Sequence, residues 1–161
     1  MDKKRRFLDG RIRLLIMRKI ILAQKEHLSL VAEIEKAVFS EPWSEKSLEL
    51  CLTDSAFCIC CFEDDELASY CTLITVLDEA QIINVATHPD FRGRGCAKEV
   101  LKALDIECKK RDINIISLEV RESNMPAISL YQHLGFGIEG KRKDFYKNPR
   151  ENALVMIKKL D

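Results

Sequence analysis

The sequence predicts a single domain built on one mixed sheet, of α/β or α+β class, flanked by about four helices. Its 161 residues suit one hydrophobic core, and no repeat or low-complexity linker divides them. Short strand-like runs alternate with segments whose apolar residues recur at helical spacing. Hydrophobic residues make up 47% of the chain and charged residues 32%, as in globular proteins. No apolar run approaches the ~20 residues that cross a membrane.

The first predicted elements are a strand and two helices. Residues 18–23 form the strand, and the apolar residues of 28–38 recur at the spacing of a helix. Ser44 is placed to N-cap a second helix, and Trp43 and Leu48 are placed to form a hydrophobic staple around that cap. This pattern indicates a packing role for Trp43, with a contact to substrate as the alternative.

A hairpin and a further strand follow in the sequence. We predict strands at 57–62 and 67–80, joined by an acidic turn at 63–66. Another strand is predicted at 82–87, where a His-Pro-Asp sequence ends the apolar run. These segments supply the centre of the predicted sheet.

The C-terminal half alternates helices and strands. One face of a helix at 97–111 is apolar, and basic residues close its C-terminal end, where the helix dipole favours positive charge. A shorter helix at 125–134 has Ser123 or Asn124 as its N-cap and a glycine just past its end. The remaining predicted strands are 113–120 and 153–160.

The charge is balanced overall, with 26 basic and 26 acidic residues, but it is unevenly distributed. Residues 1–19 carry eight Lys and Arg against two Asp, a net charge of +6, so the rest of the chain is at −6. The acidic body favours a cationic amine or a basic peptide as partner over nucleic acid. We interpret residues 1–16 as a basic surface extension, or as sequence upstream of a start at Met17, and residues 17–161 as the domain. A helix for a partner or a membrane surface is the alternative for the extension.

The seven cysteines are odd in number and scattered, which argues against a disulfide framework and favours a reducing cytoplasm. Cys58, Cys60 and Cys61 form the densest group. Zinc ligands are usually spaced as separate Cys-x-x-Cys pairs, and Cys60 and Cys61 should point to opposite faces of a strand. We therefore expect buried core cysteines, no metal and a cytoplasmic protein.

The clearest functional pattern is a strand, a glycine-rich turn and a helix start at 83–98. Gly93 and Gly95 let the backbone approach a ligand, while the helix dipole and unpaired amides at the helix start favour an anion. Arg94 and Lys98 can add charge-assisted bonds to phosphate. The turn is not a P-loop, because G-x-x-x-x-G-K-S/T is missing, and it lacks the third glycine of a dinucleotide fingerprint.

Two residues downstream are candidates for proton transfer. Glu119 lies inside the apolar strand at 113–120, where burial disfavours the charged carboxylate, as suits a general base for an amine. The alternative is a Glu that pairs with an Arg or faces solvent. Tyr131 lies two helical turns after Asn124, so its hydroxyl can face the same ligand as the helix cap, unless it is an ordinary half-buried tyrosine.

The loop fits the pattern Q/R-x-x-G-x-G/A as Arg92-x-x-Gly95-x-Ala97, and it resembles motif A of the GNAT superfamily of N-acetyltransferases. Ala97 stands where glycine is commoner, which the motif allows. The resemblance implies the GNAT acyltransferase fold with a mainly antiparallel sheet, and acetyl-CoA as co-substrate. It also implies that loop amides bind the pyrophosphate and that the preceding strand binds the pantetheine arm and acetyl group. The implied cofactor contacts are Val85, Ala86, Thr87, Arg92, Gly93, Arg94, Gly95, Cys96, Ala97, Lys98 and Asn124.

A longer string runs from Leu118 to Phe136 and fits L-E-V-R-x-S-N-x-x-A-I-x-L-Y-x-x-x-G-F at every fixed position. It resembles the RimI group of GNAT enzymes, the ribosomal-protein alanine N-acetyltransferases. That group also carries Pro-Trp-Ser before its second helix, as this chain does at 42–44. The resemblance covers roughly residues 17–161 and leaves 1–16 outside it.

The resemblance implies a role for each residue of the string that can carry chemistry. Glu119 would be the general base that deprotonates the α-ammonium of the substrate through water, and Tyr131 the general acid that protonates the departing thiolate. Asn124 would contact the cofactor. The amine then attacks the thioester directly while strand and loop amides stabilise the oxyanion. No acyl-enzyme is expected, because no histidine stands in a recognisable pairing with a cysteine.

The segment 142–146 occupies the place where the group has R-R-N-Y-Y. Tyr146 matches, whereas Asp144 and Phe145 depart from the pattern. In the group this loop closes over the acceptor peptide, so the departures bear on peptide preference more than on chemistry. A solvated hairpin tip is the alternative. The candidate substrate-binding residues are therefore Tyr146 and Trp43.

Together these motifs imply N-terminal acetylation of a protein, and the expected acceptor is the N-terminal alanine of a small-subunit ribosomal protein. We expect no direct contact with nucleic acid or with a membrane. One alternative is a GNAT enzyme that acetylates lysine side chains or a small amine. Another is a non-catalytic acyl-CoA-binding module, which is disfavoured because Glu119 and Tyr131 are both present.

Overall fold

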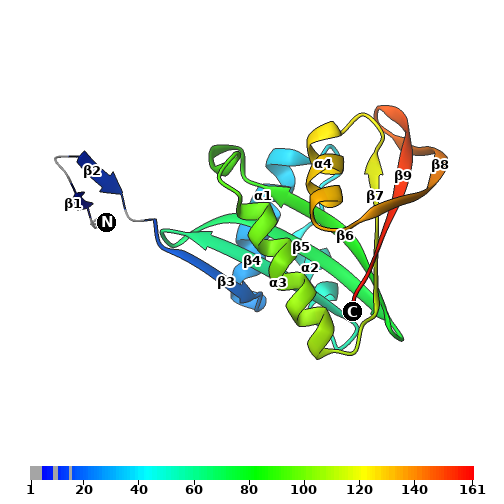
Figure 1. The fold of residues 1–161 in the computed structure, drawn as a ribbon, viewed down its shortest axis with the longest axis horizontal. Helices are drawn as coiled ribbons and strands as arrows, with labels where there is room; N and C mark the ends of the chain where they lie inside the picture. Colours follow the sequence, from blue (N-terminus) through cyan, green and yellow to red (C-terminus); the bar gives the residue numbers. More distant parts are fainter. Residues whose placement is uncertain (1–4, 9–10, 15) are drawn as a thin grey trace.

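The computed structural model describes residues 5–8, 11–14 and 16–161, with side chains from residue 16 onward, and its main feature is a seven-stranded sheet (Figure 1). The strand order is β3-β4-β5-β6-β7-β9-β8, and every neighbouring pair is antiparallel except β6 and β7. The predicted mixed, mainly antiparallel sheet is confirmed. Its strands are β3 (Arg18–Leu22), β4 (Ala56–Glu63), β5 (Glu66–Val76), β6 (Glu79–Thr87), β7 (Ile115–Arg121), β8 (Gly137–Lys147) and β9 (Arg150–Lys159).

Helices cover both faces of this sheet, and four of those in the described chain are α-helices, as predicted. Ser44 caps the second of them, since its hydroxyl accepts a hydrogen bond from the backbone N–H of Ser47 at 3.1 Å. The helices are α1 (Leu28–Val38), α2 (Glu45–Leu48), α3 (Cys96–Lys110) and α4 (Met125–His133), with short 3₁₀ turns η1 (Lys25–His27), η2 (Glu49–Cys51) and η3 (Pro89–Phe91).

Each face of the sheet has its own apolar core. One core lies between the sheet and α1 with α2, and the other lies between the sheet and α3 with α4. Successive residues of β4 alternate between them, so that Cys60 belongs to the first core and Cys61 to the second. All seven cysteines are buried free thiols, which confirms their predicted place in the core.

The predicted strand at 67–80 is wrong, because it is two strands. β5 ends at Val76, and β6 begins at Glu79 after a tight turn. Leu77 occupies that turn with φ +56° and is 94% exposed. An apolar residue in the left-handed region is uncommon, and the run contains no glycine, proline or asparagine, so Asp78 is the one local signal of the turn.

Strand β8 was not predicted, and the acceptor loop expected at 142–146 is part of it. Most side chains of β8 are charged or exposed, since it lies at the edge of the sheet with β9 as its partner. An edge strand with both faces in solvent has no apolar alternation from which it could be recognised.

The first part of the chain contains β1 (Arg5–Leu8) and β2 (Arg11–Leu14), which pair with each other in an antiparallel sheet of two strands. A helix in this segment, the alternative considered above, is therefore wrong for these residues. The rest of the expected extension at 1–16 lies largely outside the described residues.

The feature that positions the functional site is the short pairing of the two parallel strands. β6 and β7 pair only where residues 79–81 face residues 115–117. Beyond that point no pairing joins the two strands, although each keeps its antiparallel partner on the other side. A gap between central strands that is open at one end can admit an extended ligand.

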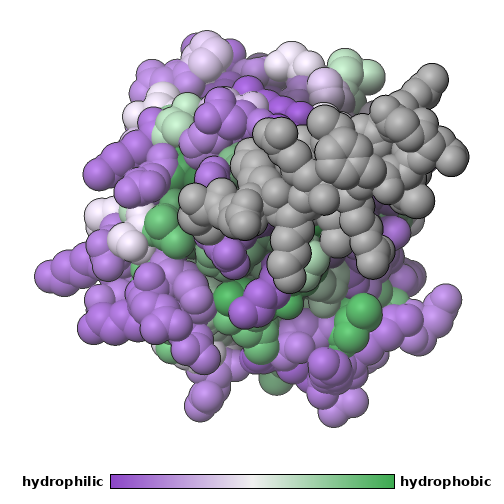
Figure 2. Space-filling view, turned by 90° about the vertical axis from the view of Figure 1, so that its left-hand side faces the viewer, coloured by the Kyte–Doolittle hydropathy of each residue, from purple (hydrophilic) through white to green (hydrophobic). Residues whose placement is uncertain are grey.

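The outer surface is mixed in character. Figure 2 shows one face of the molecule, on which hydrophilic residues predominate and most apolar residues lie near the centre. Among the helices formed by the described residues, none has the length and hydropathy that crossing a membrane requires.

Candidate active site

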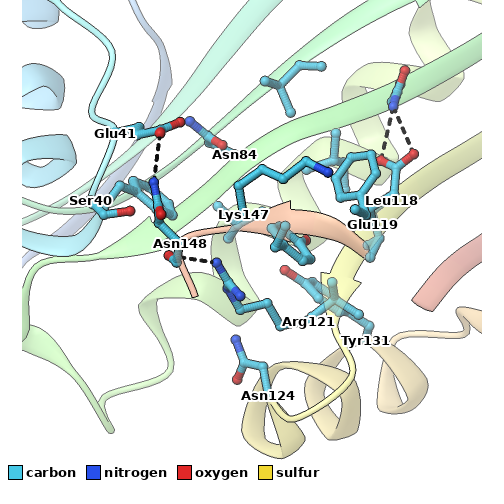
Figure 3. A pocket seen from close by; sticks show the side chains of 18 residues that line it. Ser40, Glu41, Asn84, Leu118, Glu119, Arg121, Asn124, Tyr131, Lys147 and Asn148 are labelled. Carbon is cyan, nitrogen blue, oxygen red and sulfur yellow. Dashed lines mark hydrogen bonds between the residues drawn. The ribbon is translucent and has the colours of Figure 1, made fainter. Parts of the chain in front are cut away.

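A cavity of about 490 Å³ opens at the point where β6 and β7 separate (Figure 3), and its size is typical of small-molecule sites. Its walls come from both strands, α4, the loop after α1 and the β8–β9 hairpin. The structure brings five of the predicted site residues together in its lining: Val85, Glu119, Asn124, Tyr131 and Tyr146.

Glu119 enters the cavity from β7 and is held by two neighbours. Its side chain is 12% exposed, Gln81 Nε2 donates to its Oε2 at 3.1 Å, and Arg142 Nε lies 3.3 Å from its Oε1. Both contacts hold the carboxyl group in the cavity, where it can accept a proton from a bound amine. The sequence left two alternatives for Glu119, a buried residue or a partner of an arginine. Both are observed, because Glu119 is largely buried and also pairs with Arg142.

Tyr131 reaches the same cavity from α4 and keeps its proton. It is 8% exposed, and its ring packs edge-on against Phe136 with centroids 5.8 Å apart. Burial is the main cause that raises the pKa of Tyr131 above its ordinary value. The hydroxyl is therefore protonated throughout the neutral range and can act as a proton donor.

Asn124 joins β7 to α4 and caps the helix. Its Oδ1 accepts a hydrogen bond from the backbone N–H of Ala127 at 3.3 Å, whereas Ser123, the other predicted cap, donates its N–H to Glu151 at 2.8 Å. Asn124 and Tyr131 both line the cavity, which confirms the shared orientation expected from their helical spacing.

The glycine-rich loop has the backbone that an anion site needs. Gly93 and Gly95 have φ +75° and +77°, and a β-carbon at either position would meet no atom within 4 Å. Glycine is therefore required for the backbone conformation and not for space. Gly95 precedes α3 directly, and the first amides of that helix lack intrahelical partners. Arg92 and Lys98 are exposed beside them, so positive charge surrounds these amides.

This loop is tied to the sheet by Glu63, a buried carboxylate at the end of β4. Arg94 Nη1 donates to its Oε1 and Arg18 Nη2 to its Oε2, each at 2.7 Å, and Cys96 Sγ lies 3.4 Å from Oε2. Burial by itself would raise the pKa of Glu63, but the hydrogen bonds from Arg18 and Arg94 outweigh it and hold the pKa below its ordinary value.

The pairing with Glu63 changes what is expected of Arg94. The sequence predicts a phosphate contact for its side chain, whereas in the structure the guanidinium is held by Glu63. Sequence reasoning placed Glu63 in an acidic turn and missed this role, because only the folded chain brings β4 against the loop. No signal in the sequence indicates the pair.

Residues Val85, Ala86 and Thr87 lie where β6 has a partner strand on one side only. They pair with β5, whereas β7 pairs only with residues 79–81. Backbone N–H and C=O groups on the β7 side of this stretch can therefore hydrogen-bond an extended ligand, as a further strand would.

The two candidate substrate-binding residues differ in position. Tyr146 lines the cavity, with the Arg121 guanidinium 4.2 Å from the centroid of its ring. Trp43 is not among the cavity-lining residues, and it packs on the α1–α2 core while its backbone N–H donates to Glu35 Oε2 at 3.0 Å. The packing role that the sequence indicates for Trp43 is the one observed.

Sequence reasoning missed several polar residues of the cavity, among them Gln81, Asn84 and Glu41. Gln81 and Asn84 are polar residues within or beside a predicted apolar strand, and that contrast was a usable signal. Glu41 follows α1, and its Oε1 accepts a hydrogen bond from Asn148 Nδ2 at 3.2 Å, so it joins two walls that are far apart in the sequence. No local pattern predicts such a contact.

Several known proteins are similar to this chain in sequence and in fold. The model of the acetyltransferase (GNAT) family matches residues 28–136. A Salmonella typhimurium protein named ribosomal protein bS18 alanine N-acetyltransferase is 33% identical over 142 residues, which span 87% of this chain and 96% of that protein. A Haemophilus ducreyi protein of the same name is 37% identical over 127 residues, which span 77% of this chain and 88% of that protein.

A solved structure agrees with these matches. The crystal structure of the ribosomal-protein-S18-alanine N-acetyltransferase from Escherichia coli superposes with a TM-score of 0.84 at 31% identity, covering 90% of this chain and 95% of that one. The structure of Ard1 from Thermoplasma volcanium, at 20% identity and a TM-score of 0.79, shares the fold. With the family model matched across both motifs and close relatives aligned over most of their length, the chain belongs to the GNAT family of acetyltransferases.

Proposed function

We propose that this N-acetyltransferase transfers the acetyl group of acetyl-CoA to the α-amine of the N-terminal alanine of a small-subunit ribosomal protein of the bS18 type. The observation that carries the proposal is that a carboxyl group, Glu119, and a protonated phenol, Tyr131, line one cavity. The names of the similar Salmonella and Haemophilus proteins support the choice of acceptor. Because a ribosomal protein is the acceptor, the proposal places the enzyme in the cytoplasm.

Glu119 is the general base in this proposal. An α-amine is largely an ammonium ion near neutral pH, and it must lose a proton before its nitrogen can attack a carbonyl carbon. Glu119 accepts that proton directly or through one water, while Gln81 and Arg142 hold the carboxylate in place. The nitrogen then attacks the thioester directly.

Tyr131 is the general acid. It gives its phenolic proton to the sulfur of the leaving thiolate as the carbon–sulfur bond breaks. Backbone N–H groups on the open edge of β6 at 85–87 stabilise the negative charge that develops on the carbonyl oxygen. Asn124, at the start of α4, contacts the pantetheine arm.

The glycine-rich loop holds the pyrophosphate of acetyl-CoA. The backbone amides of 93–98 supply hydrogen bonds at the start of α3, and the exposed side chains of Arg92 and Lys98 supply charge. Arg94 contributes its backbone amide, while Nη1 of its half-exposed guanidinium pairs with Glu63 and holds the loop in place.

Residues 17–161 form the catalytic domain, and the acceptor reaches it through the open side of the cavity. Tyr146 on β8 lines that side together with Arg121. A peptide that inserts its N-terminus here meets Glu119 on β7. No contact with nucleic acid or with a lipid surface is needed for this transfer.

The experiment that tests the proposal is acetylation of a synthetic peptide. Purified protein, acetyl-CoA and an alanine-initiated hexapeptide that also contains a lysine are incubated, and mass spectrometry locates the acetyl group. We expect one acetyl group on the α-amine, and no product from the same peptide with a blocked α-amine. Acetylation of the lysine or of small amines alone would show that the acceptor is wrong. Binding of acetyl-CoA without any acetylation across a panel of N-termini would indicate a non-catalytic module.

A further inference from the structure

A buried carboxylate, Glu35 on α1, lies behind the cavity and has no part in the proton transfers above. It is fully buried and accepts hydrogen bonds from the Tyr70 hydroxyl, from Asn84 Nδ2 at 2.7 Å and from the backbone N–H of Trp43 at 3.0 Å. Within residues 16–161, no lysine or arginine lies within 4.0 Å of its carboxylate oxygens. A buried charge is costly without partners, and here only neutral donors supply them.

All three partners of Glu35 donate to its carboxyl oxygens. A backbone N–H, as at Trp43, can only donate. Burial is the main cause that raises the pKa of the Tyr70 hydroxyl, which therefore remains protonated and donates as well. Both oxygens of Glu35 are thus occupied as acceptors, and its position behind the cavity is fixed.

Glu35 also determines which end of the Asn84 amide faces the cavity. Asn84 Nδ2 donates to Glu35 Oε1 at 2.7 Å, and two oxygens at that distance would repel each other, so the NH₂ group of Asn84 faces Glu35. Its Oδ1 then points away and accepts no hydrogen bond from residues 16–161. Because no buried side-chain polar atom in that part of the chain lacks a partner, Oδ1 is accessible from the cavity that Asn84 lines (Figure 3).

A β-bulge turns Asn84 toward this space. In the pairing with β5, Thr72 opposes Asn84 and Leu73 opposes Ile82, so Ile83 is the extra residue. Bulges near active sites commonly re-aim side chains. Gln81 and Asn84 would face opposite sides of a regular strand, but with the bulge both line the cavity.

We propose that Asn84 Oδ1 binds the ammonium group of the acceptor, and that Glu35 is the positioning residue that orients Asn84. This inference rests on the proposed function, since it assigns the acceptor subsite of the same cavity. Asn84 directly precedes Val85, where β6 begins its proposed contacts with acetyl-CoA. An amine bound at Asn84 is therefore held next to the acetyl group.

The test compares the binding of a charged and a neutral peptide to the enzyme–CoA complex. Calorimetry measures an alanine-initiated hexapeptide with a free α-amine and its N-acetylated form, for wild type, Asn84→Leu and Glu35→Gln. Both variants should weaken the free-amine peptide about tenfold or more, as expected for a lost hydrogen bond to a charged group, and the acetylated peptide much less. Glu35→Gln preserves the shape of the side chain. It therefore tests the carboxyl group itself and the orientation that this group imposes on the Asn84 amide.

Controls separate this inference from a general loss of structure. Asn114→Leu removes an exposed amide that bonds Asp78 at the β5–β6 turn, and it should change neither peptide's affinity. The inference would be overturned if the variants bound both peptides equally weakly or with unchanged affinity. It would also be overturned if only the affinity for acetyl-CoA fell. The binding assay needs no turnover, so selective binding without acetylation would refute the proposed function and leave the ammonium site standing.

Discussion

Glu119 and Tyr131 divide the two proton transfers of the reaction between a carboxyl group with polar neighbours and a phenol with an apolar one. Gln81 and Arg142 hold the Glu119 side chain in the cavity. Tyr131 has an apolar neighbour in Phe136, and burial raises the pKa of its hydroxyl, which keeps its proton at neutral pH. Direct attack by an ammonium substrate requires one group that accepts a proton and one that donates a proton, and these two side chains supply them.

Glu119→Gln tests the base. Near neutral pH we expect kcat/KM to fall by about 10²–10⁴-fold, the usual contribution of a general base. An α-amine loses its proton to solvent above a pH of about 8, so the deficit should shrink as the pH rises. Steady-state kinetics from about pH 6 to about pH 10 measure this ratio. A deficit that is the same at every pH would show that Glu119 is not the base.

Tyr131→Phe tests the acid. The ring and its contact with Phe136 remain, so acetyl-CoA affinity should change little, while turnover falls by about 10²-fold or more. Because burial raises the pKa of Tyr131, wild-type turnover should also show no loss from phenol ionisation below about pH 10. Pre-steady-state kinetics and a direct binding assay separate the two effects. A parallel loss of affinity and turnover would assign Tyr131 to binding.

At the scale of elements, the loop between β6 and α3 depends on a carboxylate from another strand. Glu63, at the end of β4, binds Arg94 of the loop and Arg18 of β3, and Arg18 also donates to the Arg94 carbonyl at 2.9 Å. Three segments are therefore joined at one buried charge. The shape of the anion-binding loop is maintained by this junction as well as by its two glycines.

Glu63→Gln tests the junction. The folded-state pKa of Glu63 lies below its ordinary value of 4.5, so the ion pairs stabilise the fold above that pH and are lost as the pH falls through the folded-state pKa. At neutral pH we expect a loss on the order of 1–3 kcal/mol, since both arginines are partly exposed. Thermal melts of variant and wild type should converge only once the pH falls below the folded-state pKa of Glu63.

The control for this change is another glutamate that pairs with an arginine. Glu107 bonds Arg111 one turn along α3 at 2.9 Å, away from the loop. Glu107→Gln should cost no more than about 0.5 kcal/mol and leave the KM for acetyl-CoA unchanged, whereas Glu63→Gln should raise that KM. Equal KM values for the two variants would show that Glu63 does not maintain the loop.

The elements that the sequence predicts well are those whose signals are local. The helices α3 and α4 have apolar periodicity, a cap and a glycine at a boundary, and each appears within a residue or two of its expected range. The turn at Leu77 and the edge strand β8 were missed for a physical reason. Leu77 takes a conformation that its side chain does not favour, and β8 buries too little surface to impose an apolar pattern.

At the scale of the whole molecule, too, the residues that can be predicted are those brought together by local sequence. Glu119, Asn124 and Tyr131 were predictable because one strand and the helix after it bring them together. Glu35 and Glu63 were not, since the side chains that bond them lie in other elements and 31 or more positions away in the sequence. Tertiary structure alone selects these two among the 26 acidic residues of the chain.

Binding of acetyl-CoA should stabilise the whole domain, because the ligand fills the gap between central strands that pair over only a few residues. A ligand at about 100 times its dissociation constant adds about 2.7 kcal/mol, which for a chain of this size raises Tm by roughly 5–10 °C. Hydrogen exchange should slow most at 82–87 and 118–121, which lie on either side of the gap.

Two substitutions at one glycine show whether the loop causes this stabilisation. Gly95→Glu places a charge and a strained residue at φ +77°, and it should abolish the rise in Tm. Gly95→Ala carries the same backbone strain without the charge, so it should keep part of the rise. A full rise in Gly95→Glu would mean that the pyrophosphate binds elsewhere. A complete loss in both variants would mean that backbone conformation, rather than charge, governs the site.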